Sequence, residues 1–121
     1  KFSGIITHRN LERFLKELMS VSEKWKDRLT DQLCKALLSL DSEEEAYRFL
    51  EDVATIGEII AFAQRLEVAR LLYEGNNYPQ VVQKTGASTA TISRAKNLIE
   101  HGADGFTLVL ERIGKKEEGK A

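Results

Sequence analysis

The sequence predicts an all-α protein. Between its turns, nearly every segment spaces apolar residues at helical intervals, and a single proline interrupts the 121 residues. Two strings, S-x-x-E at residues 42–45 and T-x-x-E at residues 55–58, have the form of capping boxes, which begin helices. The composition, 42% hydrophobic and 31% charged, suits one folded domain and argues against a disordered chain or a membrane protein.

The first predicted helix covers residues 7–27. Its apolar residues fall on one stripe, which consists of Leu11, Phe14, Leu15, Leu18, Trp25 and Leu29. The same spacing continues to residue 40, which predicts that the first two helices form one long rod. Cys34, the single cysteine, lies in an apolar run and is expected to be a buried core thiol. Trp25 is expected to be a packing anchor.

Two further helices are predicted to begin at the capping boxes. Asp41 or Ser42 would cap a helix with the apolar face Ala46, Phe49, Leu50 and Val53, and Glu45 could reach back to Ser42 in a capping box. Thr55 and Glu58 would open a longer helix that ends at Gly75. Apolar residues cover much of its circumference, so we expect a central, buried helix.

The segments after Gly75 are short and predict a helix-turn-helix. A helix over residues 78–84 would carry Pro79 in its first turn, Gly86 would form the turn, and Ser88 would cap a helix over residues 89–100. The two helices are expected to be joined by apolar and small residues, namely Val81, Val82, Ala87, Ile92 and Ala95. An ordinary helical hairpin is the alternative. A last amphipathic segment, 106–113, precedes a frayed polar tail at 114–121.

The charge distribution favours a nucleic-acid interface at this motif. A net charge of −1 alone argues against nucleic-acid binding. However, an even spread of the 19 acidic residues would put about four in any stretch of 25, and residues 75–99 contain none. The same stretch carries Lys84, Arg94 and Lys96, so it can approach phosphates without repulsion.

The second helix of the motif is predicted to enter the major groove of duplex DNA. Hydroxyl groups and an alanine methyl group can meet base edges there, while lysine and arginine hold phosphates. The predicted DNA-binding residues are Lys84, Ser88, Thr89, Ala90, Ser93, Arg94, Lys96 and Asn97. With so few cations in one chain, affinity should require two copies, so we expect a symmetric dimer.

Two strings resemble the tryptophan-repressor superfamily. GASTATISR at residues 86–94 is similar to the turn and recognition helix of that family, with the pattern G-A-x-x-A-T-I-[ST]-R. QRLEVARLLYEG at residues 64–75 looks like its long central helix and following glycine. The resemblance spans about residues 31–112 and is closer still to the YerC/YecD-type branch. It implies an all-α, intertwined homodimer and a sequence-specific transcriptional regulator, most simply a repressor.

The resemblance also implies an effector pocket. Thr55, Arg65 and Arg94 match positions that contact tryptophan in the repressor, and two arginines can grasp a carboxylate. Ala95 stands where the repressor has glycine beside the ligand ring. We therefore expect the pocket position to persist while the added methyl group disfavours tryptophan as corepressor. No other cofactor is expected.

The expected domain organisation is an N-terminal helix at residues 1–30, the helix-turn-helix domain at 31–113 and the tail at 114–121. His8 and His101 are expected to be surface or cap residues, and the sequence contains no metal-ligand spacing and no nucleophile-base pair, so we expect no enzyme. No apolar stretch reaches the roughly 20 residues of a membrane span, and a cytoplasmic protein is expected. The alternatives are a protein-interaction module, a DNA-binding fragment of a transposase or recombinase, and a monomeric helical bundle.

Overall fold

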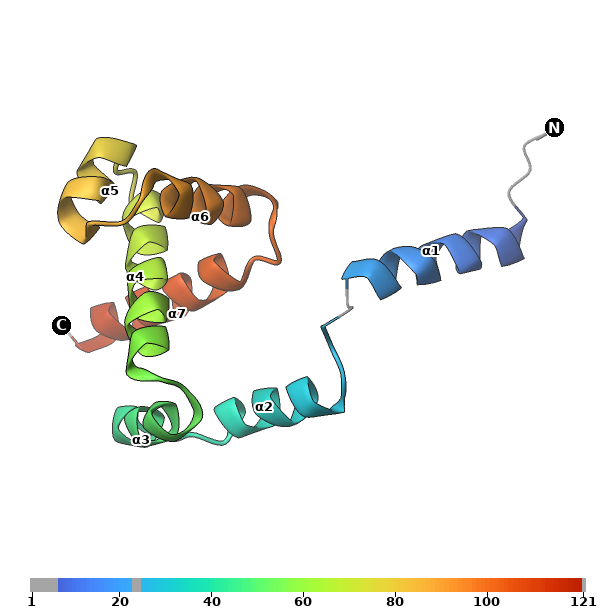
Figure 1. The fold of residues 1–121 in the computed structure, drawn as a ribbon, viewed down its shortest axis with the longest axis horizontal. Helices are drawn as coiled ribbons and strands as arrows, with labels where there is room; N and C mark the ends of the chain where they lie inside the picture. The colour runs from blue at the N-terminus through green and yellow to red at the C-terminus, as the bar shows by residue number, and fades with distance from the viewer. Residues whose placement is uncertain (1–6, 23–24, 121) are drawn as a thin grey trace. The chain divides into compact units, whose positions relative to one another are not determined.

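The computed structural model describes residues 7–22 and 25–120, without the side chains of residues 16–22 and 116–120. Within these ranges it contains seven helices and no strand, so the predicted all-α class is confirmed (Figure 1). Contacts divide the chain into two compact units, Lys1–Phe49 and Leu50–Ala121.

The first unit holds α1 (His8–Ser22), α2 (Arg28–Leu38) and most of α3 (Glu43–Val53). The prediction of one long rod is wrong, because Asp27 begins a new helix. Its backbone is extended, its carboxylate accepts the Thr30 N–H at 2.9 Å, and the Thr30 hydroxyl oxygen accepts the Asp27 N–H at 2.7 Å. This reciprocal capping box outweighs the continuing apolar spacing. The same Thr30 N–H holds the pKa of Asp27 below its usual value.

No side chain described in this first unit is buried. Cys34 is exposed and Trp25 is 62% exposed, so the predictions of a core thiol and a packing anchor are both wrong for the single chain. The Lys26 ammonium lies 5.6 Å from the centroid of the Trp25 ring. Cys34 and Trp25 are exposed because an amphipathic helix buries its apolar stripe only where another element packs against it. Neither α2 nor α3 has a buried residue.

The second unit is built around α4 (Ile56–Tyr73), which contacts α5 (Tyr78–Thr85), α6 (Thr89–His101) and α7 (Gly105–Lys120). Figure 1 shows α5 and α6 beside the upper end of α4 and α7 crossing α4 below them. The core of the second unit consists of Val68, Ala69, Leu71, Val81, Ala87, Ile92, Ala95 and Leu110. The central place of α4 is confirmed. However, only its C-terminal half is buried, because Ile56, Ile60 and Phe62 near its start are exposed.

The predicted capping box at Thr55 forms completely, whereas the one at Ser42 forms only in part, because the Glu45 carboxylate accepts the Asp41 N–H at 2.8 Å and not the Ser42 N–H. The Ser42 hydroxyl oxygen accepts the Glu45 N–H at 3.1 Å, and the Thr55 hydroxyl oxygen accepts the Glu58 N–H at 3.1 Å. The Glu58 carboxylate accepts the Thr55 N–H at 2.8 Å, which holds the pKa of Glu58 below its usual value. At the other end of the unit, α7 continues to Lys120 instead of ending at residue 113. Lysine and glutamate are good helix formers, and no proline stops the helix there.

Candidate nucleic-acid interface

The helix pair α5–α6 is joined by a turn that its sequence specifies. The Asn77 side chain accepts the Gln80 N–H at 2.9 Å and so caps α5, whose first turn contains Pro79. At the other end, Gly86 has a φ of +71° and donates its N–H to the Val82 carbonyl oxygen at 2.8 Å. Glycine adopts this left-handed conformation without steric cost, so the chain turns sharply as predicted.

The second helix begins at Ser88, also as predicted. The Ser88 hydroxyl oxygen accepts the Thr91 N–H at 3.1 Å, which caps α6. Each of the two helices extends one residue beyond its predicted end, to Thr85 and His101. The Gln64 side chain of α4 donates to the Thr85 carbonyl oxygen at 3.2 Å and ties the pair to the central helix.

The helix pair encloses a closed core. Val81 of α5 and Ile92 of α6 are fully buried, and Ala87 and Ala95 lie beside them in the same cluster. The predicted contribution of Val82 to this contact is wrong, since its side chain is 39% exposed. Consecutive residues lie about 100° apart around a helix, so Val82 turns outward when Val81 turns inward.

The residues predicted to face DNA are all exposed. They are Lys84 at the end of α5, the cap residue Ser88, and Thr89, Ala90, Ser93, Arg94, Lys96 and Asn97 on α6. Ile92 and Ala95 point the opposite way, into the core. α6 therefore presents a polar, hydroxyl-rich side outward, and DNA contact by this side stays a prediction.

The three cationic side chains on this surface differ in the hydrogen bonds and ion pairs that they already make. The Lys84 ammonium donates to the Asn76 side-chain oxygen at 3.2 Å, and the Lys96 ammonium lies 3.7 Å from the Glu100 carboxylate. Lys84 also helps to lower the pKa of Glu67, although the hydrogen bond from Arg70 is the larger cause. In the described part of the chain, no hydrogen bond or ion pair engages Arg94. Arg94 is thus the cation best placed to accept a new anionic partner.

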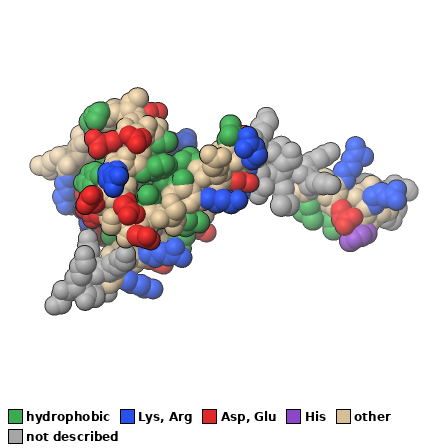
Figure 2. Space-filling model, turned by 90° about the horizontal axis from the view of Figure 1, so that it is seen from below, with side chains coloured by type: hydrophobic (Ala, Val, Ile, Leu, Met, Phe, Trp, Pro, Cys, Tyr) green, Lys and Arg blue, Asp and Glu red, His purple; other side chains and the backbone are tan. Residues whose placement is uncertain are grey.

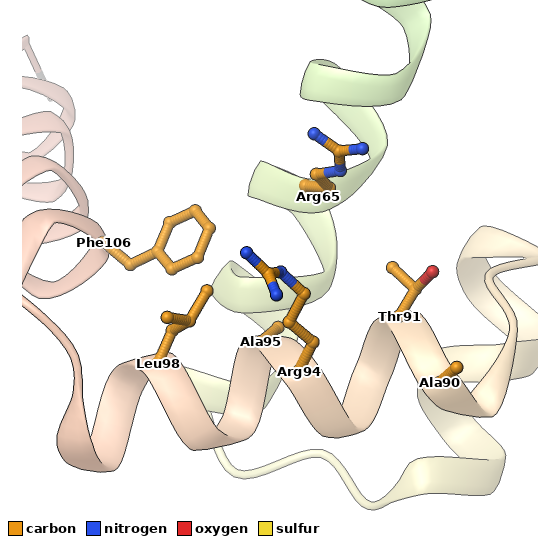
Figure 3. A pocket seen from close by; sticks show the side chains of 7 residues that line it. All are labelled: Arg65, Ala90, Thr91, Arg94, Ala95, Leu98 and Phe106. Carbon is orange, nitrogen blue, oxygen red and sulfur yellow. The ribbon is translucent and has the colours of Figure 1, made fainter. Parts of the chain in front are cut away.

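A pocket of about 220 Å³ lies beside α6 (Figure 3). It is lined by Arg65, Ala90, Thr91, Arg94, Ala95, Leu98 and Phe106. The structure thus brings together Arg65 and Arg94, two of the three predicted effector residues. Thr55 is not among the lining residues of this chain and caps α4 instead. Effector binding by this pocket stays a prediction.

Phe106 and Leu98 were not predicted as site residues. Their apolar side chains line the pocket from α7 and α6 and are half-buried. The G-A-D-G string at residues 102–105 signals a turn, but a turn signal does not state where the next aromatic ring will lie.

Other site classes find no support in the described residues. No group of histidine, cysteine, aspartate and glutamate in the described part of the chain is arranged to hold a metal ion. Both histidines are exposed, as expected, and the His8 ring lies 3.4 Å from the Glu12 carboxylate. None of the helices in the described ranges has the length and apolar character to cross a membrane.

Comparison with known proteins identifies the family. The sequence model of the Trp repressor protein family matches residues 28–114. The uncharacterized protein YerC of Bacillus subtilis (strain 168) is 48% identical over 95 residues, which cover 78% of this chain and 91% of YerC.

Two crystal structures have the same fold. A TrpR-like protein from Eubacterium eligens ATCC 27750 is 49% identical with a TM-score of 0.72, covering 76% of this chain and 95% of that one. A candidate Trp repressor from Staphylococcus aureus is 41% identical with a TM-score of 0.73, covering 76% and 92%. The chain therefore belongs to the Trp repressor family, whose members are DNA-binding regulators and not enzymes.

Proposed function

We propose that this protein is a sequence-specific transcriptional repressor whose helix α6 reads the major groove of duplex DNA. The observation that carries the proposal is the two-sided character of α6. Its hydroxyl-rich side is exposed, and Ile92 and Ala95 anchor the opposite side in the core. Short side chains allow the helix to approach base edges closely, and a buried anchor fixes its orientation.

Arg94 is proposed to bind a DNA phosphate, or a guanine at the groove edge. It lies on the outward side of α6 and has no competing ion pair in the described residues. Residues 75–99 contain no acidic side chain that would repel the backbone of DNA. Lys84 and Lys96 are proposed to give weaker phosphate contacts, because Asn76 and Glu100 already engage them.

The active form is proposed to be a homodimer. Each unit of one chain leaves apolar side chains exposed, including Leu33 and Leu37 on α2 and Ile60 and Phe62 on α4. Hydrophobic side chains are visible at the surface in Figure 2. A second copy would cover such surfaces and supply a second reading helix, which doubles the phosphate contacts.

The binding site is found by selecting bound duplexes from a random pool. We expect palindromic winners, because a two-fold dimer reads two half-sites about one helical turn apart. Affinity for the selected duplex should fall steeply with added salt, since phosphate neutralisation releases counterions. A protein-interaction module would enrich no duplex, and that outcome would overturn the proposal.

The assigned reading side is tested by Arg94→Ala, measured by fluorescence anisotropy with the selected duplex. We expect affinity to fall roughly tenfold to a hundredfold, the range for one lost base or phosphate contact, while the circular dichroism of the helices stays unchanged. Arg112→Ala, which removes an exposed arginine from α7, is the matched control and should bind normally. Equal affinities of the two variants would show that α6 does not read DNA.

A further inference from the structure

Phe106 separates two hollows of the second unit. Its side chain and that of Leu98 line the pocket that contains Arg65 and Arg94. The same two side chains line a neighbouring apolar hollow of about 480 Å³, whose other lining residues are Leu66, Ala103, Gly105 and Val109. Among the residues that line the pocket, Phe106 supplies an aromatic ring, which therefore belongs to the protein and not to an added ligand.

The turn before α7 sets the position of this ring. Gly102 donates its N–H to the Leu98 carbonyl oxygen at 2.8 Å, and any Cβ at residue 102 would collide with the backbone of Leu98. Asp104 has a φ of +64°, a conformation that few residues other than glycine adopt. A tight connection with two such restrictions leaves the start of α7 little freedom. In Figure 3 the Phe106 ring points from α7 toward Arg94 and Leu98.

The ring lies where α6 would otherwise lack apolar support. Towards α4 and α5, α6 is held by buried Ile92 and Ala95. On the pocket side, the nearest apolar groups beyond α6 itself come from Phe106. Removing the ring would join the two hollows and leave the C-terminal half of α6 with an unfilled space beside it, which weakens its placement.

We infer that Phe106 is a positioning residue for DNA binding: its ring supports α6 from the wall of the pocket, so the protein binds DNA without an added aromatic effector. This inference rests on the proposed function and concerns the regulation of the same site. The chain itself then supports α6 at all times, and the side chains of Arg65 and Arg94 remain free to bind anions.

The test compares Phe106→Ala with Phe106→Tyr and Val109→Ala. Val109 lies on the same helix and lines the apolar hollow but not the pocket. Affinity for the selected duplex is measured by anisotropy at a temperature where circular dichroism shows every variant folded, and sedimentation checks its oligomeric state. We expect Phe106→Ala to lose roughly tenfold in affinity, and the other two variants to stay within about twofold of the wild type.

Adding a free aromatic ring to Phe106→Ala distinguishes a positioning role of Phe106 from a role in stability alone. Indole at about 1 mM should restore much of the DNA affinity of Phe106→Ala, because an apolar ligand can refill the space that the substitution creates. The wild type should bind the duplex equally with no addition, with indole and with tryptophan at that concentration. The inference would be overturned if Phe106→Ala were less stable and indole did not restore its DNA affinity. It would also be overturned if Phe106→Ala bound the duplex like the wild type.

The outcomes also distinguish the inference from the proposed function. A wild type that binds its duplex only when tryptophan or another aromatic acid is added would overturn the built-in support and leave DNA binding intact. A wild type that selects no duplex under any condition would overturn the proposed function itself.

Discussion

The two compact units of this chain differ in whether one copy covers its own apolar residues. In the unit Leu50–Ala121, Val68, Val81 and Ile92 are fully buried and hold α4, α5 and α6 together. In the unit Lys1–Phe49, no described side chain is buried, and Leu38 is 86% exposed. The difference teaches that the helix-turn-helix has a core of its own within one chain, whereas the described apolar side chains of the N-terminal helices are not covered by that chain.

The largest expected effect tests the core of the reading unit. Ile92→Ala should lower the free energy of unfolding by about 3 kcal/mol, because a fully buried side chain leaves a cavity in a small core. Urea unfolding followed by circular dichroism measures it. Val82→Ala is the control and should cost less than about 1 kcal/mol, since Val82 is partly in solvent. Equal losses would mean that the core does not depend on Ile92.

The next effect tests whether a second copy, as in the proposed homodimer, covers the N-terminal unit. Leu33→Asp should weaken dimer association by about 2 kcal/mol, the order of burying one leucine side chain, and should barely change a monomer. Sedimentation equilibrium measures the association constant. Gln32→Asp places the same charge at an adjacent polar position and should leave the dimer intact. A Leu33→Asp protein that remains fully dimeric would show that α2 is not covered by the second copy.

A smaller effect tests the start of α4, close to the boundary between the units. Thr55→Ala removes the acceptor of the Glu58 N–H and should cost about 1 kcal/mol of stability, as loss of a helix cap usually does. Thr55→Ser keeps the hydroxyl group and should restore most of it. Differential scanning calorimetry of the two variants distinguishes a capping role from any other, since loss in both would point to the methyl group.

The smallest expected effect is a change in the pH dependence of folding stability. The Arg70 guanidinium donates to the Glu67 carboxylate at 2.7 and 2.8 Å and lowers the pKa of Glu67 below its usual value of 4.5. The unfolded chain therefore binds this proton more tightly, so the stabilisation is complete above pH 4.5 and is lost as the pH falls through the lower folded pKa. Both side chains are partly in solvent, which limits the effect to below about 1 kcal/mol.

This acid effect is measured by urea unfolding between pH 3 and 7. Glu67→Gln should be slightly less stable than the wild type at pH 7 and should lose less stability on acidification. Parallel pH profiles of the two proteins would show that the Glu67–Arg70 pair contributes nothing measurable.

Much of the fold was predictable because its signals are local. The helix starts at Ser42, Thr55 and Ser88 depend on a side chain and an N–H three residues later, so a short string contains the whole interaction. The turn at Gly86 depends on one residue that tolerates a positive φ. The exposed side of α6 followed from the same periodicity, and its DNA contacts stay a prediction.

Two wrong predictions were local, namely the single long rod, which the Asp27 capping box interrupts, and the end of α7 at residue 113. The other wrong predictions concern contacts between elements. Cys34 and Trp25 lie on an apolar stripe, but a stripe does not specify whether its cover comes from the same chain. Val82 and Val81 are equally apolar, and only the direction from which α6 approaches decides which of them is buried. Phe106 lines the pocket beside Leu98 because the short turn between α6 and α7 places the start of α7 next to α6.

The sequence by itself determined where most of the helices begin, where the reading turn lies and which side of α6 is polar, because these depend on hydrogen bonds and spacings within a few residues. Only the tertiary structure decided which apolar side chains the chain buries and which ring lines the pocket with Arg94, because these depend on how different helices come together. A side chain is buried only where two elements meet, and local spacing does not state which elements meet.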